Sequence, residues 1–153
     1  MIQRIQSIFL LIAAVLMGLI FFYPIADLLS SESQLYVYAY NGLQIANQEH
    51  DLYLKIIPSI VLLSVIVFIS FASIFLYKKR IIQMRINLFN IILTIGYMGL
   101  SYYYINIFSK QLEAVVSYNI CAIFPAFAIL LTFFAIRAIG KDEALIRSMD
   151  RLR

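Results

Sequence analysis

The sequence predicts an all-α membrane protein, a left-handed bundle of four transmembrane helices with a small extracytoplasmic β-hairpin in its first loop and a cytoplasmic C-terminal helix. Of its 153 residues, 63% are hydrophobic and 13% are charged, whereas soluble domains average about 45–50% apolar and about 25% charged residues. Four apolar runs reach the length of about 20 residues that a bilayer core of about 30 Å requires. They leave little chain for a soluble domain, so we expect one integral-membrane domain over residues 1–153.

The apolar runs place the four spans at about 5–29, 56–77, 86–108 and 115–136. The first run is not a signal peptide, because it is longer than a signal-peptide core and ends in aromatic residues before Pro24, where cleavage needs small residues. The first connection, 30–55, is long and forms the predicted outer loop. The two later connections are tight turns, so the helices that they join should be antiparallel neighbours.

The basic residues predict the orientation of the chain, because Lys and Arg near the ends of spans are retained in the cytoplasm. Of the twelve, only Lys55 and Lys110 fall on the side of the outer loop. Both termini should therefore be cytoplasmic. The net charge of +4 then reflects this orientation and contact with anionic lipids at the cytoplasmic face, and it does not indicate a nucleic-acid partner.

A polar seam runs along the third predicted span at spacings of 3, 4, 3, 4 and 3, the period of a left-handed packed stripe. Its members are Asn87, Asn90, Thr94, Tyr97, Ser101 and Tyr104. One interpretation is packing, because polar groups join helices in lipid through hydrogen bonds. The other interpretation is a polar pathway. The middles of the predicted spans contain no ionisable residue, which argues against coupled transport.

Residues 35–45 of the outer loop predict a tight β-hairpin. Large aromatic and β-branched residues alternate there around Asn41-Gly42, a strong hairpin pattern. Tyr36, Tyr38 and Tyr40 would share one face. These tyrosines either contribute to an aromatic belt at the membrane interface or form a docking face for a partner protein.

The chain offers little conventional site chemistry. A single cysteine and a single histidine exclude a disulfide framework and bis-His haem ligation. The cluster Glu49-His50-Asp51 consists of adjacent residues, which cannot all converge on one metal ion, and no oriented catalytic partner is evident. We therefore expect no catalytic residue, metal site or cofactor.

The predicted cytoplasmic tail, residues 137–153, reads as further helix with an apolar strip and basic residues. Arg147 and Arg151 are four residues apart and would lie on one side of it. Such a helix either rests on anionic headgroups or docks on a partner.

Both ends of the chain resemble those of a known family. The opening reads MIQRIQSIFLLIAAVLM and the closing stretch reads RAIGKDEALIRSMDRLR. They look like the two ends of the proteins in a four-span bacterial family known as domain of unknown function 4293. The resemblance covers the whole chain. The resemblance implies a cytoplasmic-membrane protein of Bacteroidota and transfers no catalytic residue.

Three functional hypotheses follow. The leading one is a non-catalytic accessory, scaffold or assembly subunit of a cell-envelope complex, with a membrane protein or a second copy of the chain as its partner. The alternative is a small channel or permease that uses the polar seam of the third span. The third is an enzyme that acts on lipid at the outer surface through His50 and Asp51.

Overall fold

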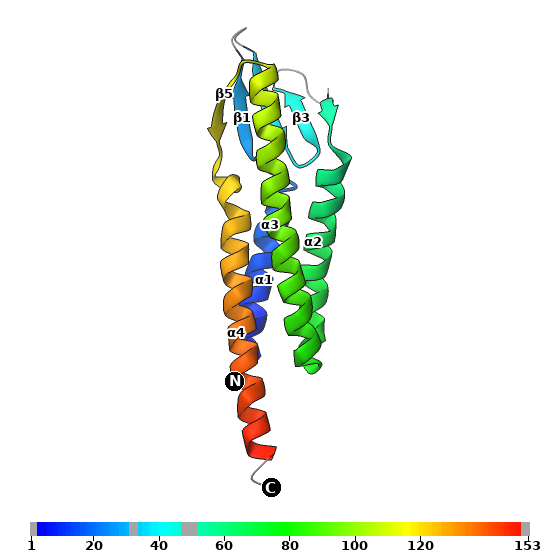
Figure 1. Ribbon diagram of the computed structural model, residues 1–153, viewed down its shortest axis with the longest axis vertical. Coiled ribbons are helices and arrows are strands. Elements are labelled where there is room, and N and C mark those ends of the chain that lie inside the picture. Colours follow the sequence, from blue (N-terminus) through cyan, green and yellow to red (C-terminus); the bar gives the residue numbers. More distant parts are fainter. Residues whose placement is uncertain (1–2, 31–33, 47–51, 151–153) are drawn as a thin grey trace.

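The computed structural model describes residues 3–30, 34–46 and 52–150, which form four long helices, five strands and two short 3₁₀ helices. In chain order they are α1 (Gln3–Leu19), β1 (Ala26–Leu29), β2 (Leu35–Ala39), β3 (Gly42–Ile45), β4 (Leu52–Lys55), α2 (Ile57–Phe75), η1 (Leu76–Lys78), α3 (Arg80–Gln111), β5 (Val115–Tyr118), η2 (Ile120–Ile123) and α4 (Phe124–Asp150). The helices lie side by side in an elongated bundle (Figure 1). We call the end that carries the strands the sheet end. The opposite end, with the start of α1 and the turn η1, is the basic end.

The prediction of an all-α fold is wrong, because a five-stranded antiparallel sheet accompanies the four helices. Within the described residues, three helices are long and apolar enough to cross a membrane: Ile57–Phe75, Arg80–Gln111 and Ile120–Ala144. Helix α1 is also apolar but has only 17 residues, a rise of about 25 Å. The chain thus has the helix lengths and composition of a membrane protein.

Two of the predicted spans contain strands, which corrects the boundaries 5–29 and 115–136. The helix of the first ends at Leu19 and is followed by β1, while the second begins with β5. The hydropathy of a short apolar run does not distinguish a strand from a helix. These two segments become strands because they pair with each other, in the register Ala26↔Tyr118 to Leu29↔Val115.

The predicted hairpin is present as the centre of a larger sheet. The strand order is β4-β3-β2-β1-β5, and each neighbouring pair is antiparallel. Strands β2 and β3 meet at the turn through the pair Ala39↔Gly42. Gly42 has a φ of 134°, and a Cβ there would overlap the carbonyl oxygen of Leu54 on β4. Only glycine therefore fits this turn without strain.

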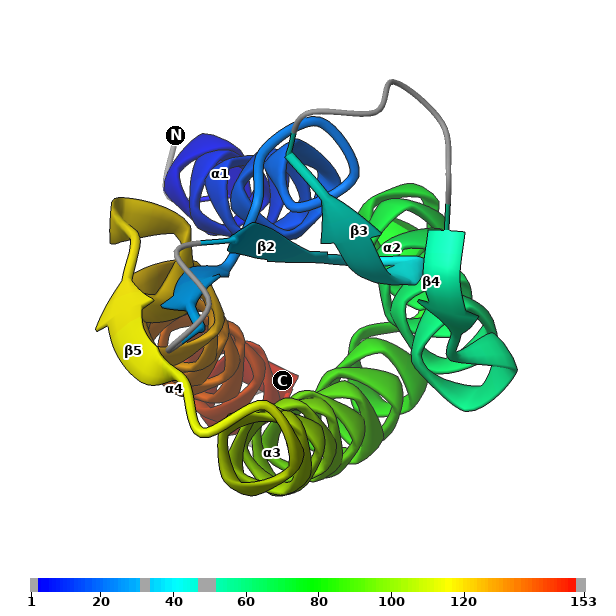
Figure 2. The ribbon, with the colours of Figure 1, turned by 90° about the horizontal axis from the view of Figure 1, so that it is seen from above.

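The sheet curves around the upper part of α3, as Figure 2 shows from above. With 32 residues, α3 rises about 48 Å, which exceeds a bilayer core of about 30 Å. Its last turns therefore continue into the sheet end (Figure 1). There Tyr38 of β2 packs against Phe108 of α3, with their ring centroids 6.3 Å apart. The hydroxyl of Ser30 also donates to the carbonyl oxygen of Leu112 at 2.9 Å, which ties the end of β1 to the end of α3.

At the basic end, α1 and α4 are joined by a buried polar contact. Nε2 of Gln6 donates to Oδ2 of Asp142 at 2.6 Å, and both side chains are buried. Helix α4 then continues without a break to Asp150 and projects beyond the other helices (Figure 1). The predicted tail 137–153 is therefore, as far as it is described, the end of the same helix that forms the last span.

Candidate functional site

The polar residues of α3 face the interior of the bundle, towards α2. Five of the six seam residues are buried, and Tyr104 is partly buried. Three buried serines lie on α2. We call these eight residues the polar stripe: Asn87, Asn90, Thr94, Tyr97 and Ser101 of α3 with Ser59, Ser70 and Ser73 of α2.

The half of the polar stripe nearer the basic end is partly hydrogen-bonded. Nδ2 of Asn90 donates to the hydroxyl of Ser70 at 2.7 Å, and Nε2 of Gln83 donates to the carbonyl oxygen of Ser73 at 2.9 Å. Both bonds join α3 to α2. In contrast, Oδ1 of Asn90 and both amide atoms of Asn87 have no hydrogen-bond partner among the described residues, although Asn87 is fully buried. Each buried polar group left in this state costs about 1–3 kcal/mol.

The half nearer the sheet end gathers four buried hydroxyl groups, which we call the hydroxyl cluster. They belong to Tyr38 of β2, Ser59 of α2, and Tyr97 and Ser101 of α3, and none has a hydrogen-bond partner within the described structure. Burial raises the pKa of the Tyr38 phenol, and the nearby hydroxyls of Ser101 and Ser59 partly oppose that rise without reaching hydrogen-bond geometry. The cluster is therefore a small polar region, enclosed where the bundle meets the sheet.

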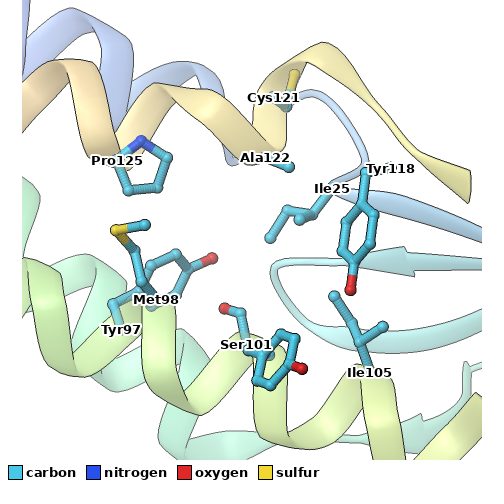
Figure 3. A pocket seen from close by; sticks show the side chains of 10 residues that line it. Ile25, Tyr97, Met98, Ser101, Ile105, Tyr118, Cys121, Ala122 and Pro125 are labelled. Atoms are coloured by element: carbon cyan, nitrogen blue, oxygen red, sulfur yellow. The ribbon is translucent and has the colours of Figure 1, made fainter.

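A pocket of about 150 Å³ adjoins the hydroxyl cluster, between α3 and the start of α4. Figure 3 shows the hydroxyls of Tyr97 and Ser101 pointing into it from α3. Its other walls are largely apolar, with Ile105 on the same helix and Pro125 on α4. Tyr102, 63% exposed, lines the outer part. The pocket thus joins a buried polar floor to the outer surface of the bundle.

The three tyrosines proposed from the sequence as a docking face lie against the molecule itself. Tyr36 and Tyr38 are buried, and Tyr40 is partly buried with its ring 5.0 Å from that of Phe21. Their side chains are engaged in packing between the sheet and the ends of the helices. Sequence reasoning missed that β2 turns this face inwards, because the sheet that covers the helix ends was not predicted.

The exposed side of the sheet end lies at β5 instead. Val115 is 75% exposed and Tyr118 is 54% exposed, and the following Ile120 is also exposed. We call Tyr102, Val115, Tyr118 and Ile120 the β5 surface. One sequence pattern could have predicted β5, namely the β-branched and aromatic run at 115–118, which is typical of a strand. This run continues directly into the apolar run of α4, so it was assigned to the last span.

Several predicted residues lie where the structure gives no side-chain geometry. Arg147 is on α4, but its side chain is outside the described part, and Arg151 lies outside the described residues. The cluster of Glu49, His50 and Asp51 also lies outside them. Within the described ranges, no group of three or more His, Cys, Asp or Glu side chains is placed to hold a metal ion.

The fold and the site define a class of membrane protein in which a helix bundle with a polar interior carries an antiparallel sheet at one end. Within that class, the chain belongs to the family described as Domain of unknown function (DUF4293), whose model matches residues 2–152. The family resemblance predicted from the two ends of the sequence is thereby confirmed. No curated protein matches the chain.

Proposed function

We propose that this protein is a non-catalytic accessory, scaffold or assembly subunit of a membrane complex in the bacterial cell envelope. In this proposal it resides in the cytoplasmic membrane, with the sheet end outside and both termini in the cytoplasm. The lopsided distribution of Lys and Arg supports this orientation. So does the position of the start of α1 and the end of α4, which lie towards the same end of the molecule (Figure 1).

The observation that carries the proposal is the open edge of β5. Within the described part of the chain this strand pairs only with β1, and it contains no charged residue. The opposite edge strand, β4, ends in Lys55, and its pairing with β3 is interrupted by a bulge between Leu43 and Gln44. Charges and bulges are devices that protect an edge from pairing with another chain. The β5 edge has only its short length as protection, so it is the edge suited to a partner strand.

The partner in this proposal is a membrane protein, or a second copy of this chain, that adds an extended segment to β5 at the outer face. Main-chain hydrogen bonds would provide the affinity of such a strand addition. Exposed Val115 and Tyr118 would contribute apolar contacts. On the cytoplasmic side, basic residues such as Lys141 would contact anionic lipids, and nucleic acid is not a proposed partner.

Proline substitution at the open edge tests this proposal. The backbone N–H of Asn119 donates to the carbonyl oxygen of Ile25, the residue before β1, so the antiparallel alternation turns the backbone groups of Val116 to the open side. Val116→Pro removes an outward N–H and leaves the pairing with β1, whereas the control Val116→Thr retains the donor. Each variant would be purified from native membranes in polymer nanodiscs, cross-linked and analysed by mass spectrometry. We expect a stoichiometric partner with Val116→Thr and its loss with Val116→Pro; equal recovery would contradict the proposal.

A small channel or permease is the second candidate, and one observation favours it. The amide of Asn87 and Oδ1 of Asn90, which have no hydrogen-bond partner in the described ranges, lie inside the bundle, where water or a small polar solute would satisfy them. Reconstituted protein would be assayed for flux of water and small polar solutes into liposomes. Replacing Asn90, Thr94 and Tyr97 by Leu should abolish a flux that uses the polar stripe. Flux that persists in this variant would remove the stripe as a pathway.

A further inference from the structure

The pocket between α3 and the start of α4 has a polar floor and apolar walls. At the floor, the hydroxyls of Tyr97 (1% exposed) and Ser101 (7% exposed) point into the space (Figure 3). Met98, Ile105 and Pro125 form apolar parts of its wall. None of the side chains that line the pocket is an acid, a lysine, an arginine or a histidine.

The two floor hydroxyls lack a hydrogen-bond partner among the described residues, and so do Ser59 and Tyr38 behind them. A hydroxyl can donate one hydrogen bond and accept two, so the four hydroxyls, which lie close to one another, retain the capacity to bond a further group. Buried polar groups in native proteins are satisfied by the protein, by ordered water or by a ligand.

Size and polarity limit what the pocket can hold. A cavity of about 150 Å³ with apolar walls is large enough for a molecule such as benzene, so this pocket accommodates a headgroup rather than a whole lipid. Since no charged side chain lines it, an ionised headgroup would be desolvated there without a counter-charge. Outside the pocket, Ile123 at the end of η2 and Phe127 of α4 are exposed apolar residues in the segment Ile120–Ala144, which can span a membrane.

We propose that this pocket binds the uncharged hydroxyl or carbonyl headgroup of a membrane amphiphile. The headgroup takes hydrogen bonds from Tyr97 and Ser101, and the hydrocarbon chain leaves the pocket along the exposed apolar side chains of α4. Tyr118 of β5 also lines this pocket, but the headgroup contacts proposed here lie on α3, so variants at Tyr97 and Ser101 test this site without altering the β5 edge.

Photolabelling of the full chain in phosphatidylcholine nanodiscs tests the site. The probe is hexadecanol with a diazirine near the hydroxyl and an alkyne at the far end, and the comparison probe is the matching hexadecanoic acid, ionised at pH 8. We expect the alcohol to label peptides around 97–105 and 121–125, with unlabelled hexadecanol competing. The acid should label them about tenfold less. Equal labelling by both probes would overturn the proposal, and so would uniform labelling of all lipid-exposed helices.

Matched variants separate a ligand contact from a structural role. Tyr97→Phe with Ser101→Ala should lower pocket labelling about tenfold, while Tyr103→Phe, which removes an exposed phenol of the same helix outside the pocket lining, should leave it unchanged. The thermal midpoint in lipid-free detergent should not fall in the double variant, because the removed hydroxyls make no hydrogen bond within the described protein. Ser101→Ala alone is the fallback if the double variant is poorly expressed. Unchanged labelling in a folded variant would mean that the Tyr97 and Ser101 hydroxyls do not bind the headgroup, which would overturn the proposal.

Discussion

Two of the helix interfaces in the bundle, α1 with α4 and α2 with α3, differ in the residues that they bury. Helices α1 and α4 form the most extensive interface, and their buried residues include Ala13, Ala14, Ala128 and Ala135. Helices α2 and α3 bury serine, asparagine and threonine instead. Small residues let helices approach closely in lipid, while polar residues join them by hydrogen bonds. At the second interface, polar atoms of Asn87 and Asn90 have no hydrogen-bond partner among the described residues, so this interface is the one that points to ligands or water.

The largest expected effect on stability comes from disrupting the interface of α1 with α4. Ala14→Phe places a large ring at a position that is fully buried between packed helices, so overpacking should lower the free energy of unfolding by about 3 kcal/mol. Ile12→Phe, on the exposed side of the same helix, is the matched control and should change it by less than about 0.5 kcal/mol. Denaturation by SDS in mixed micelles measures both. A tolerated Ala14→Phe would show that α1 and α4 are not closely packed.

Removing the hydrogen bond between Asn90 and Ser70 should cost less. Nδ2 of Asn90 donates to the Ser70 hydroxyl, and interhelical hydrogen bonds in membranes contribute about 0.6–1.7 kcal/mol. A double-mutant cycle with Asn90→Ala and Ser70→Ala should therefore give a coupling energy of about 1 kcal/mol. As a control, Asn106→Ala removes a bond only to the carbonyl of Tyr102 on its own helix. A coupling energy near zero would mean that the bond does not join α2 to α3.

Asn87 offers a sharper test of the polar interface, because the expected sign is reversed. Its amide is fully buried and has no partner among the described residues. Replacement by the similarly sized Leu removes an unsatisfied group, so Asn87→Leu should raise the free energy of unfolding by about 0.5–1 kcal/mol. The same SDS titration applies. Marked destabilisation would instead reveal that Asn87 is satisfied by bound water or a ligand.

The smallest effect concerns pH and Tyr38. Burial raises the pKa of its phenol in the folded protein above the ordinary value of about 10. Above pH about 10 the Tyr38 phenol loses its proton in the unfolded chain but keeps it in the folded protein. The free energy of unfolding therefore falls as pH rises. Between pH 9 and pH 11 the wild type should lose more stability than Tyr38→Phe, by less than about 1 kcal/mol. Equal losses would indicate that the phenol reaches solvent.

Much of the helical architecture was predictable from local sequence. The apolar runs of α2 and α3 are long enough to be recognised by hydropathy alone. The period of polar residues from Asn87 to Ser101 also identified the side of α3 that turns inwards. The pair Asn41-Gly42 located the turn between β2 and β3, because few residues other than glycine adopt the required backbone conformation.

By itself, then, the sequence determined the membrane class, the long helices, the inward side of α3 and the central hairpin, since each depends on composition or on a period within one segment. Only the tertiary structure decided that 26–29 and 115–118 are strands, because these two segments, about ninety residues apart, pair with each other. That pairing completes the sheet, which turns Tyr36 and Tyr38 inwards and leaves β5 as an open edge. The hydroxyl cluster likewise exists only in three dimensions, because β2, α2 and α3 each contribute to it.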